Sequence, residues 1–238
     1  MQSFFAALCL AAVLAIGSAQ SDSCDASSIQ AITKCYQTYL SGYNFTMTDT
    51  LPEYWSFHNR RAQWLNDYGL HVQPQICLLG NTLVSCLQPY QCLGPNAYLQ
   101  MNAFNLTQAQ DYYIDLAVTT YQCGAGYNIG NQEFYCLAFC RERYQSDLDA
   151  CSTQMQNTIA QGGNPCTATQ QFLNCQSNIM KGCCDWNAGV YICNVDLVGV
   201  NAVSPQCSNA GLLSCPPPRT LAEMAAIAQA EIRAARHA

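Results

Sequence analysis

The sequence predicts an all-α, disulfide-rich helical bundle with an alanine-rich C-terminal helix after a proline-rich spacer. In most segments the apolar residues recur at spacings of three and four, as on one face of a helix. The period-two alternation expected of strands is nearly absent. The chain of 238 residues also contains 17 cysteines, although a chain of this length can bury an ordinary apolar core. Disulfides are therefore expected to add to the core rather than to replace it.

Residues 1–19 are predicted to form a secretory signal peptide. An apolar run extends from Phe4 to about Ile16 and is followed by three small residues that end at Ala19. This run is shorter than the ~20 apolar residues that a membrane-spanning helix needs. A buried N-terminal helix is the alternative interpretation. Cleavage after Ala19 predicts a secreted, extracellular protein.

The cysteine count fits an exported chain. One of the 17 cysteines, Cys9, lies in the predicted signal peptide, so its removal leaves an even number. In an oxidising compartment this predicts eight disulfides, each adding about 2–4 kcal/mol of stability. Their connectivity does not follow from the sequence. The expected half-cystines are Cys24, Cys35, Cys77, Cys86, Cys92, Cys123, Cys136, Cys140, Cys151, Cys166, Cys175, Cys183, Cys184, Cys193, Cys207 and Cys215.

The first two helices are predicted over residues 26–40 and 52–67. In the first segment the apolar side chains, among them Ile32, Cys35 and Tyr39, fall on one helical face. The second segment begins with Pro52, which the first turn of a helix tolerates because its missing N–H is not needed there.

Later helices are predicted from capping patterns and stop signals. The sequence TQAQ at residues 107–110 and the sequence TATQ at residues 167–170 are capping boxes, so a helix is expected to start at each. The second of these helices is expected to end at about Met180. Between them, residues 132–160 are predicted to form the longest helix, stopped by the two glycines that follow shortly after.

Residues 216–238 are predicted to lie outside the crosslinked domain, which extends over residues 20–215. Three consecutive prolines form a stiff spacer. A third capping box, made by Thr220 and Glu223, then starts the alanine-rich helix. The apolar stripe of this helix is expected to dock back on the domain or to meet a partner.

Two cysteine spacings recur in the same order in both halves of the chain. The pairs, with ten and then eight intervening residues, are Cys24/Cys35 and Cys77/Cys86 in the first half and Cys140/Cys151 and Cys166/Cys175 in the second. This order indicates two related halves with a boundary near residue 130. The alternative is coincidence, because the linkers differ and cysteines are numerous.

Charge is sparse and excludes one class of partner. Nine Lys and Arg residues against fifteen Asp and Glu residues give a net charge of −6, and the longest basic run is Arg60-Arg61. Binding to nucleic acid requires clustered positive charge, so no nucleic-acid partner is expected. After the predicted signal peptide no segment is apolar for long enough to span a membrane.

The stretch KGCCDWNAGVYIC at residues 181–193 invites comparison with secreted calcium-dependent phospholipases, which are helical and have adjacent cysteines followed closely by a His-Asp pair. Here Asn187 stands where the general-base histidine belongs, and Ala188 stands where the aspartate belongs. An asparagine cannot take a proton from an attacking water at neutral pH. The phospholipase interpretation is therefore excluded.

A metal site is the next candidate chemistry for these cysteines. Cys136 and Cys140 have a spacing that zinc sites use. In an exported chain they are instead expected to be half-cystines on successive helical turns that bridge to two other helices. Cys183 and Cys184 are expected to reach in opposite directions, because neighbouring residues rarely satisfy disulfide geometry. The sequence lacks a Cys-x2-Cys redox motif, so we predict no metal and no cofactor.

A hydrolase that uses His58 is the alternative to a non-catalytic function. His58 lies near Glu53 in an aromatic segment, YWSFHNRRAQW, and could act as a base. However, no Gly-x-Ser-x-Gly elbow accompanies it, and a histidine on a helix is more commonly packed or exposed without a catalytic role. The aromatic segments around it and around DYYIDLAVTTY could line a binding surface or fill the core.

Two asparagines fit the N-glycosylation rule. They are Asn44 in Asn-Phe-Thr and Asn105 in Asn-Leu-Thr. Export through the secretory pathway makes both available, and glycosylation predicts that both lie on the surface.

The cysteine pattern also resembles a known group of proteins. The segments CYQTYL, ICLLGNTLVSCLQPYQC and FCRERYQSDLDAC, with the CC cluster, are similar to the secreted cysteine-rich helical domains of nematodes, which include domains of unknown function and those related to chondroitin proteoglycans. The resemblance covers about residues 24–207. It implies an extracellular-matrix, eggshell or body-fluid protein with no catalytic residues. Chondroitin attachment is not expected, because the single Ser41-Gly42 pair has no acidic neighbour.

The main functional prediction is a non-catalytic secreted protein. It would act as a binding module or matrix component for a protein, a glycan or a small apolar ligand, and the sequence does not identify which.

Overall fold

The structure, a computed structural model, describes residues 23–48, 50–220, 222–224 and 226–227. Over these ranges the chain forms α-helices and one 3₁₀ turn, without a strand, and its cysteines form eight disulfides. The prediction of an all-α, disulfide-rich fold is confirmed. The predicted signal peptide with Cys9, and residues 228–238 of the predicted C-terminal helix, lie outside the described residues.

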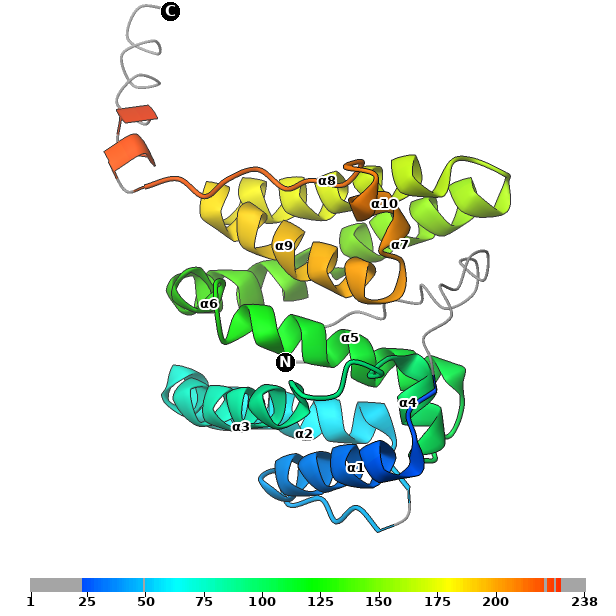
Figure 1. The fold of residues 1–238 in the computed structure, drawn as a ribbon. Coiled ribbons are helices and arrows are strands. Elements are labelled where there is room, and N and C mark those ends of the chain that lie inside the picture. Colours follow the sequence, from blue (N-terminus) through cyan, green and yellow to red (C-terminus); the bar gives the residue numbers. More distant parts are fainter. Residues whose placement is uncertain (1–22, 49, 221, 225, 228–238) are drawn as a thin grey trace, which may run out of the picture.

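The helices stack in two groups, and α5, the last helix of the first group, faces the second group (Figure 1). The first group comprises α1 (Ala26–Ser41), α2 (Tyr54–Tyr68), the 3₁₀ turn η2 (Gly69–Val72), α3 (Gln73–Leu87), α4 (Pro95–Gln100) and α5 (Leu106–Gln122). The second group comprises α6 (Tyr127–Arg143), α7 (Gln145–Ala160), α8 (Pro165–Cys183), α9 (Trp186–Val203) and α10 (Gln206–Asn209). In the described part of the chain no helix is both long enough and apolar enough to cross a membrane.

Two of the three predicted capping boxes are wrong, because an asparagine starts the helix earlier. Asn105 accepts a hydrogen bond from the backbone N of Gln108 at 2.9 Å and begins α5. Asn164 accepts one from the N of Thr167 at 3.0 Å and begins α8. Asparagine is the better N-cap, so each threonine lies inside the first turn. The third box is confirmed, since the N–H of Glu223 donates to the Thr220 hydroxyl at 3.2 Å.

The single long helix predicted over residues 132–160 is also wrong. It is two helices, α6 and α7, separated at Tyr144, whose backbone departs from helical geometry (φ −113°, ψ 25°). Apolar spacing continues across this break, and neither glycine nor proline marks it. Packing explains it: α7 packs mainly against α8, whereas α6 packs mainly against α9 and less against α8.

An aromatic core fills the first group. Tyr36, Tyr98 and Tyr112 lie at its centre, almost wholly buried, and the hydroxyls of Tyr36 and Tyr98 are hydrogen-bonded at 2.7 Å. The ring of Phe57 stacks on that of Tyr112 with centroids 6.0 Å apart. The aromatic segments of α2 and α5 therefore mainly build the core and do not form an open binding surface.

The second group packs on α5 and around the α8–α9 hairpin. Ile114 and Val118 on α5 belong to one core with apolar residues of α6, α8 and α9, and a further core lies between α7, α8 and α9. Within the hairpin, the hydroxyl of Ser177 donates to the carbonyl oxygen of Gly189 at 2.9 Å. Because α5 contributes to the cores of both groups, it joins them.

The eight disulfides form two sets, and none crosses residues 124–135. The first set is Cys24–Cys92, Cys35–Cys86 and Cys77–Cys123. The second set is Cys136–Cys184, Cys140–Cys183, Cys151–Cys175, Cys166–Cys207 and Cys193–Cys215. The two groups of helices are thus crosslinked internally but not to each other.

The two sets share a connectivity. In the first half the six cysteines pair first with fifth, second with fourth and third with sixth. Two bridges of the second half, those of Cys184 and Cys193, have no counterpart in the first half. The other six cysteines of the second half, starting at Cys140, pair in the same order. Six cysteines allow many other pairings. The match therefore favours a duplication in which α1, α3 and α5 correspond to α7, α8 and α9.

Candidate functional site

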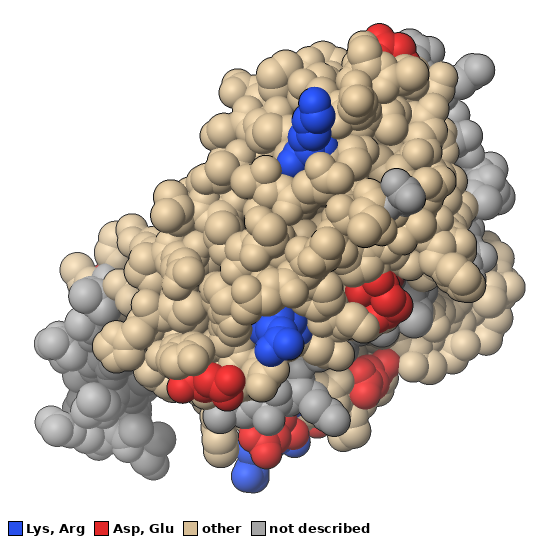
Figure 2. Space-filling model, turned by 90° about the horizontal axis from the view of Figure 1, so that it is seen from below, with Lys and Arg blue, Asp and Glu red and all other residues tan. Residues whose placement is uncertain are grey.

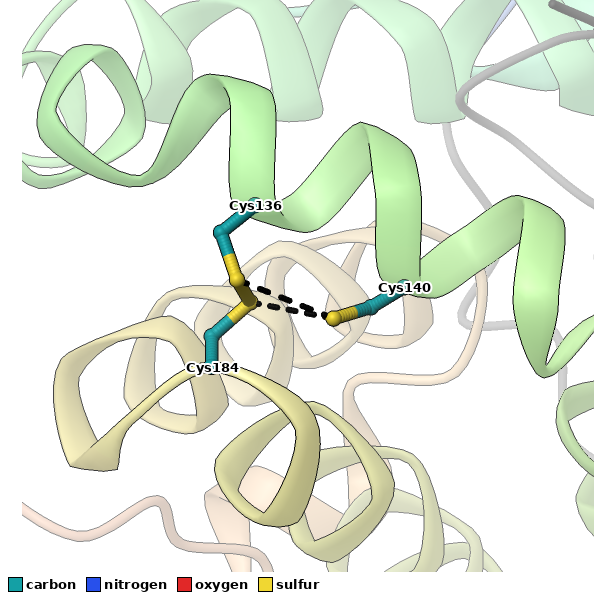
Figure 3. Close-up of side chains that lie close together, drawn as sticks. All are labelled: Cys136, Cys140 and Cys184. Atoms are coloured by element: carbon teal, nitrogen blue, oxygen red, sulfur yellow. Dashed lines mark hydrogen bonds between the residues drawn. A yellow bond between two sulfur atoms is a disulfide. The ribbon is translucent and has the colours of Figure 1, made fainter.

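The cysteine cluster of residues 136, 140, 183 and 184 links α6 to the junction between α8 and α9. Figure 3 shows three of the four, Cys136, Cys140 and Cys184, with the bridge between Cys136 and Cys184. Cys183 is the last residue of α8, and Cys184 follows it as the C-cap. Asp185 then starts α9, because its carboxylate accepts a hydrogen bond from the N of Ala188 at 2.9 Å. The acid beside the cysteines is therefore a helix cap.

The cluster differs from the prediction in where its bridges go. Cys136 and Cys140 were expected to reach two different helices, and Cys183 and Cys184 to reach in opposite directions. Instead both bridges join the same two segments. This is possible because residues four apart on a helix lie on one face, one turn apart, within reach of two adjacent residues.

The sulfur atoms of this cluster lie close together. The Sγ of Cys140 is 3.2 Å from that of Cys184 and 3.7 Å from that of Cys136, and these three lie within 4.8 Å of one another. A metal ion would need thiolates, but here each sulfur is bonded to another sulfur. In this oxidised state the cluster is a double crosslink.

His58, the candidate base, is buried within α2 and only 2% exposed. Its Nδ1 lies 3.4 Å from the hydroxyl of Tyr54, which donates a hydrogen bond to Asp115 at 3.1 Å. Burial, together with the positive charge of Arg61, lowers the pKa of His58 to about 3. The imidazole is therefore neutral near pH 7 and a weak base.

A buried ion pair next to His58 was not predicted. Arg61 is 7% exposed and Asp115 is 5% exposed, and the guanidinium donates to both carboxylate oxygens. The same guanidinium also donates to the hydroxyls of Tyr39 at 3.2 Å and Thr119 at 3.3 Å. This network ties α2 to α1 and α5. Helical spacing from Tyr54 and Phe57 places Arg61, but not its exposed neighbour Arg60, on the apolar face of α2. That spacing is the signal that could have found it.

A small cavity lies beside His58, between the two groups of helices. It is lined by residues of α2, α3, α5, α6 and α9, including Arg61, Thr119, Phe134 and Tyr191, and its volume is about 50 Å³. That volume is on the order of one or two water molecules. Its lining contains no carboxylate, and its one cysteine is in a disulfide. Glu53 is also engaged elsewhere, as the N-cap of α2. The carboxylate nearest to His58 in the network, that of Asp115, is engaged by Tyr54 and Arg61.

Both predicted glycosylation asparagines lie on the surface. Asn44 is exposed in the turn after α1, with a left-handed backbone (φ 64°). Asn105 is exposed at the start of α5. Its Oδ1 caps the helix, and this leaves Nδ2, the atom to which a glycan is attached, available. Both positions are therefore accessible to modification.

Several large apolar side chains are exposed to solvent. On α6, Tyr135 and Phe139 are 66% and 59% exposed one turn apart, and Phe104 beside the second sequon is 88% exposed. Charged side chains are scattered among uncharged ones on the face shown in Figure 2. The surface therefore offers aromatic contacts with little electrostatic attraction.

Comparison with protein-family models, with curated proteins and with solved structures finds no significant match to this chain.

Proposed function

We propose that this chain is a non-catalytic extracellular protein that acts by binding through its outer surface. The observation that carries the proposal is that the sixteen cysteines of residues 24–215 are joined in eight intramolecular disulfides. Disulfides in this number persist in secreted proteins and are rare in reducing compartments. The resemblance to secreted cysteine-rich domains of nematodes points in the same direction.

The surroundings of His58 support a non-catalytic role. A general base must lie near its working pH and within reach of the substrate, and His58 is buried with its pKa lowered to about 3. The small cavity beside it also argues against an enclosed apolar ligand, because ligand pockets are typically ~300–1,000 Å³. A protein or a glycan bound at the exposed aromatic side chains is the better candidate.

Export and oxidation test the proposal directly. The full chain, expressed in secretory cells, is expected in the medium with Gln20 at its N-terminus and with no thiol that reacts with an alkylating agent before reduction. Intact mass before and after removal of N-glycans measures all of these. Retention inside the cells, or two or more reactive thiols, would contradict the proposal.

The hydrolase alternative has its own test. The secreted protein is assayed with ester, peptide and glycoside substrates beside the variant His58→Gln, whose fold is checked by circular dichroism. Hydrolysis by the parent that the folded variant lacks would establish the alternative. Equal rates of background hydrolysis are expected.

A further inference from the structure

The segment after α10 lies extended across the α8–α9 hairpin; we call residues 212–220 the strap (Figure 1). Its first part is held firmly. The side-chain amide of Gln170 donates to the carbonyl of Ser214 at 3.0 Å and accepts from its N–H at 2.8 Å. The next residue, Cys215, is bonded to Cys193 of α9. Up to this point the strap cannot leave the hairpin while the disulfide is intact.

Beyond Cys215 the described contacts of the strap are non-covalent and converge on two residues at the start of α9. The indole N–H of Trp186 donates to the carbonyl of Pro217 at 2.9 Å. The amide of Asn187 donates to the carbonyl of Arg219 at 2.9 Å and accepts from its N–H at 2.8 Å. Asn187 is only 7% exposed, so a buried side-chain amide is satisfied by the backbone of the strap.

This arrangement recognises a main chain rather than a particular side chain at each position. A buried amide left without hydrogen-bond partners is unfavourable. The Trp186–Asn187 site therefore favours an extended segment that presents one carbonyl and, two residues later, both a backbone N–H and a carbonyl. The prolines at 216–218 fix φ near −65° and hold the strap extended. A segment that proline already restricts loses little conformational entropy when it is bound. Aromatic grooves that bind polyproline segments exploit this low cost.

One side chain is also selected. The guanidinium of Arg219 lies over the Trp186 ring at 3.5 Å from its centroid, and the ammonium of Lys181 lies 4.3 Å from the same centroid. Arginine stacks well on an aromatic face because it is planar and weakly hydrated. The site therefore fits a proline followed two residues later by an arginine.

We propose that the Trp186–Asn187 site is a peptide-binding site for extended segments of the form Pro-x-Arg, and that the chain's own residues 217–219 are its resident ligand. A partner protein that displays such a segment would displace the strap beyond Cys215, while the disulfide keeps the strap attached. This inference rests on the proposed binding function and names the class of partner.

Protection from trypsin tests whether the strap is held. In the purified, oxidised full chain, cleavage after Arg219 is expected to be slow, because its backbone and guanidinium are both engaged. The variant Asn187→Ala is expected to be cut there roughly ten to a hundred times faster, since two hydrogen bonds of about 1 kcal/mol each are lost. Asn157→Ala, at an exposed position of α7, is the matched control. Equal rates in the parent and in Asn187→Ala would overturn the proposal.

Binding in trans tests whether the site accepts a separate peptide. The full-length variant Arg219→Pro removes the strap's N–H and guanidinium but leaves Lys181, Trp186 and Asn187 unchanged. A fluorescent peptide with the sequence of residues 213–222, carrying serine at position 215, is expected to bind this variant about tenfold more tightly than it binds the parent. Adding Asn187→Ala, or replacing the peptide's arginine with alanine, is expected to abolish that gain.

Two outcomes overturn the peptide-binding proposal. One is no binding to folded Arg219→Pro at millimolar peptide. The other is equal binding to the parent, because the peptide would then be bound elsewhere. Both experiments use purified oxidised protein. A negative result in them would overturn the peptide-binding proposal only, because the proposed function is tested separately by export and thiol reactivity.

Discussion

At the scale of single residues, the buried polar groups of α2 and α5 are the least predictable feature of this chain. Arg61 and Asp115 are separated by 54 residues, yet the guanidinium and the carboxylate share two hydrogen-bonded contacts in the core. Bringing two charges out of water is costly, and their mutual attraction only offsets this cost when both are present. The pair therefore fixes how α2 and α5 meet more than it adds net stability.

Removal of one partner is expected to be severe. Asp115→Ala leaves the Arg61 charge buried without its carboxylate and should lower the free energy of unfolding by about 3–5 kcal/mol. Asp67→Ala, at an exposed position of the same helix as Arg61, should change it by less than about 0.5 kcal/mol. Guanidinium denaturation with the disulfides intact measures both. An Asp115→Ala protein as stable as Asp67→Ala would show that the pair carries no such role.

At the scale of elements, the positions of the helices were more predictable than their ends. Apolar spacing located segments of α1, α2, α5 and α8 correctly, because each helix presents one face to a core. It failed at Tyr144, where spacing persists across two helices that diverge to pack on different neighbours. The capping boxes misplaced the starts of α5 and α8, because a threonine capping pattern can lie inside a helix that a nearby asparagine already caps.

Asn105 allows capping and glycosylation to be separated. Asn105→Ala should lose both the glycan and the helix cap, and the lost cap should cost about 1 kcal/mol of stability. Asn105→Asp should lose the glycan and keep the cap, because a carboxylate accepts the same hydrogen bond. Intact mass reports the glycan, and denaturation of deglycosylated samples reports the cap. Equal stability of the two variants would contradict the capping role.

The α8–α9 hairpin depends on a close approach at Gly189. A Cβ there would lie 2.6 Å from the backbone oxygen of Ser177, so the two helices would have to separate. Gly189→Ala should destabilise the protein by about 1–3 kcal/mol. The control is Gly182→Ala in α8, where an added Cβ meets nothing within 4 Å; it should be neutral or stabilising by up to about 1 kcal/mol. Thermal or chemical unfolding distinguishes them, and a neutral Gly189→Ala would refute the close-packing argument.

At the scale of the whole molecule, the sequence was informative about class and silent about sites. The cysteine count predicted eight bridges, and two recurring spacings indicated related halves. It could not predict the connectivity, nor that the cysteine cluster forms a double link to one junction, because both depend on which helices are neighbours in space. Gln170, Trp186 and Asn187 were equally invisible as a site, since their partners are backbone groups of a distant segment.

The absence of a disulfide across residues 124–135 leads to a prediction for the whole chain. A protease site inserted between Gly124 and Ala125 should, after cleavage, give two fragments that separate on a denaturing gel without reductant. They should stay together in native buffer, because α5 shares an apolar core with α9.

The same protease site inserted after Gly162, in the turn between α7 and α8, is the matched control. That cut lies within the spans of the bridges Cys136–Cys184, Cys140–Cys183 and Cys151–Cys175, so its fragments should remain covalently joined until reductant is added. Fragments from the first cut that stay joined without reductant would require a bridge between the halves. Fragments that part in native buffer would mean that the α5–α9 contact cannot hold the two groups of helices together, and that the linker does so instead.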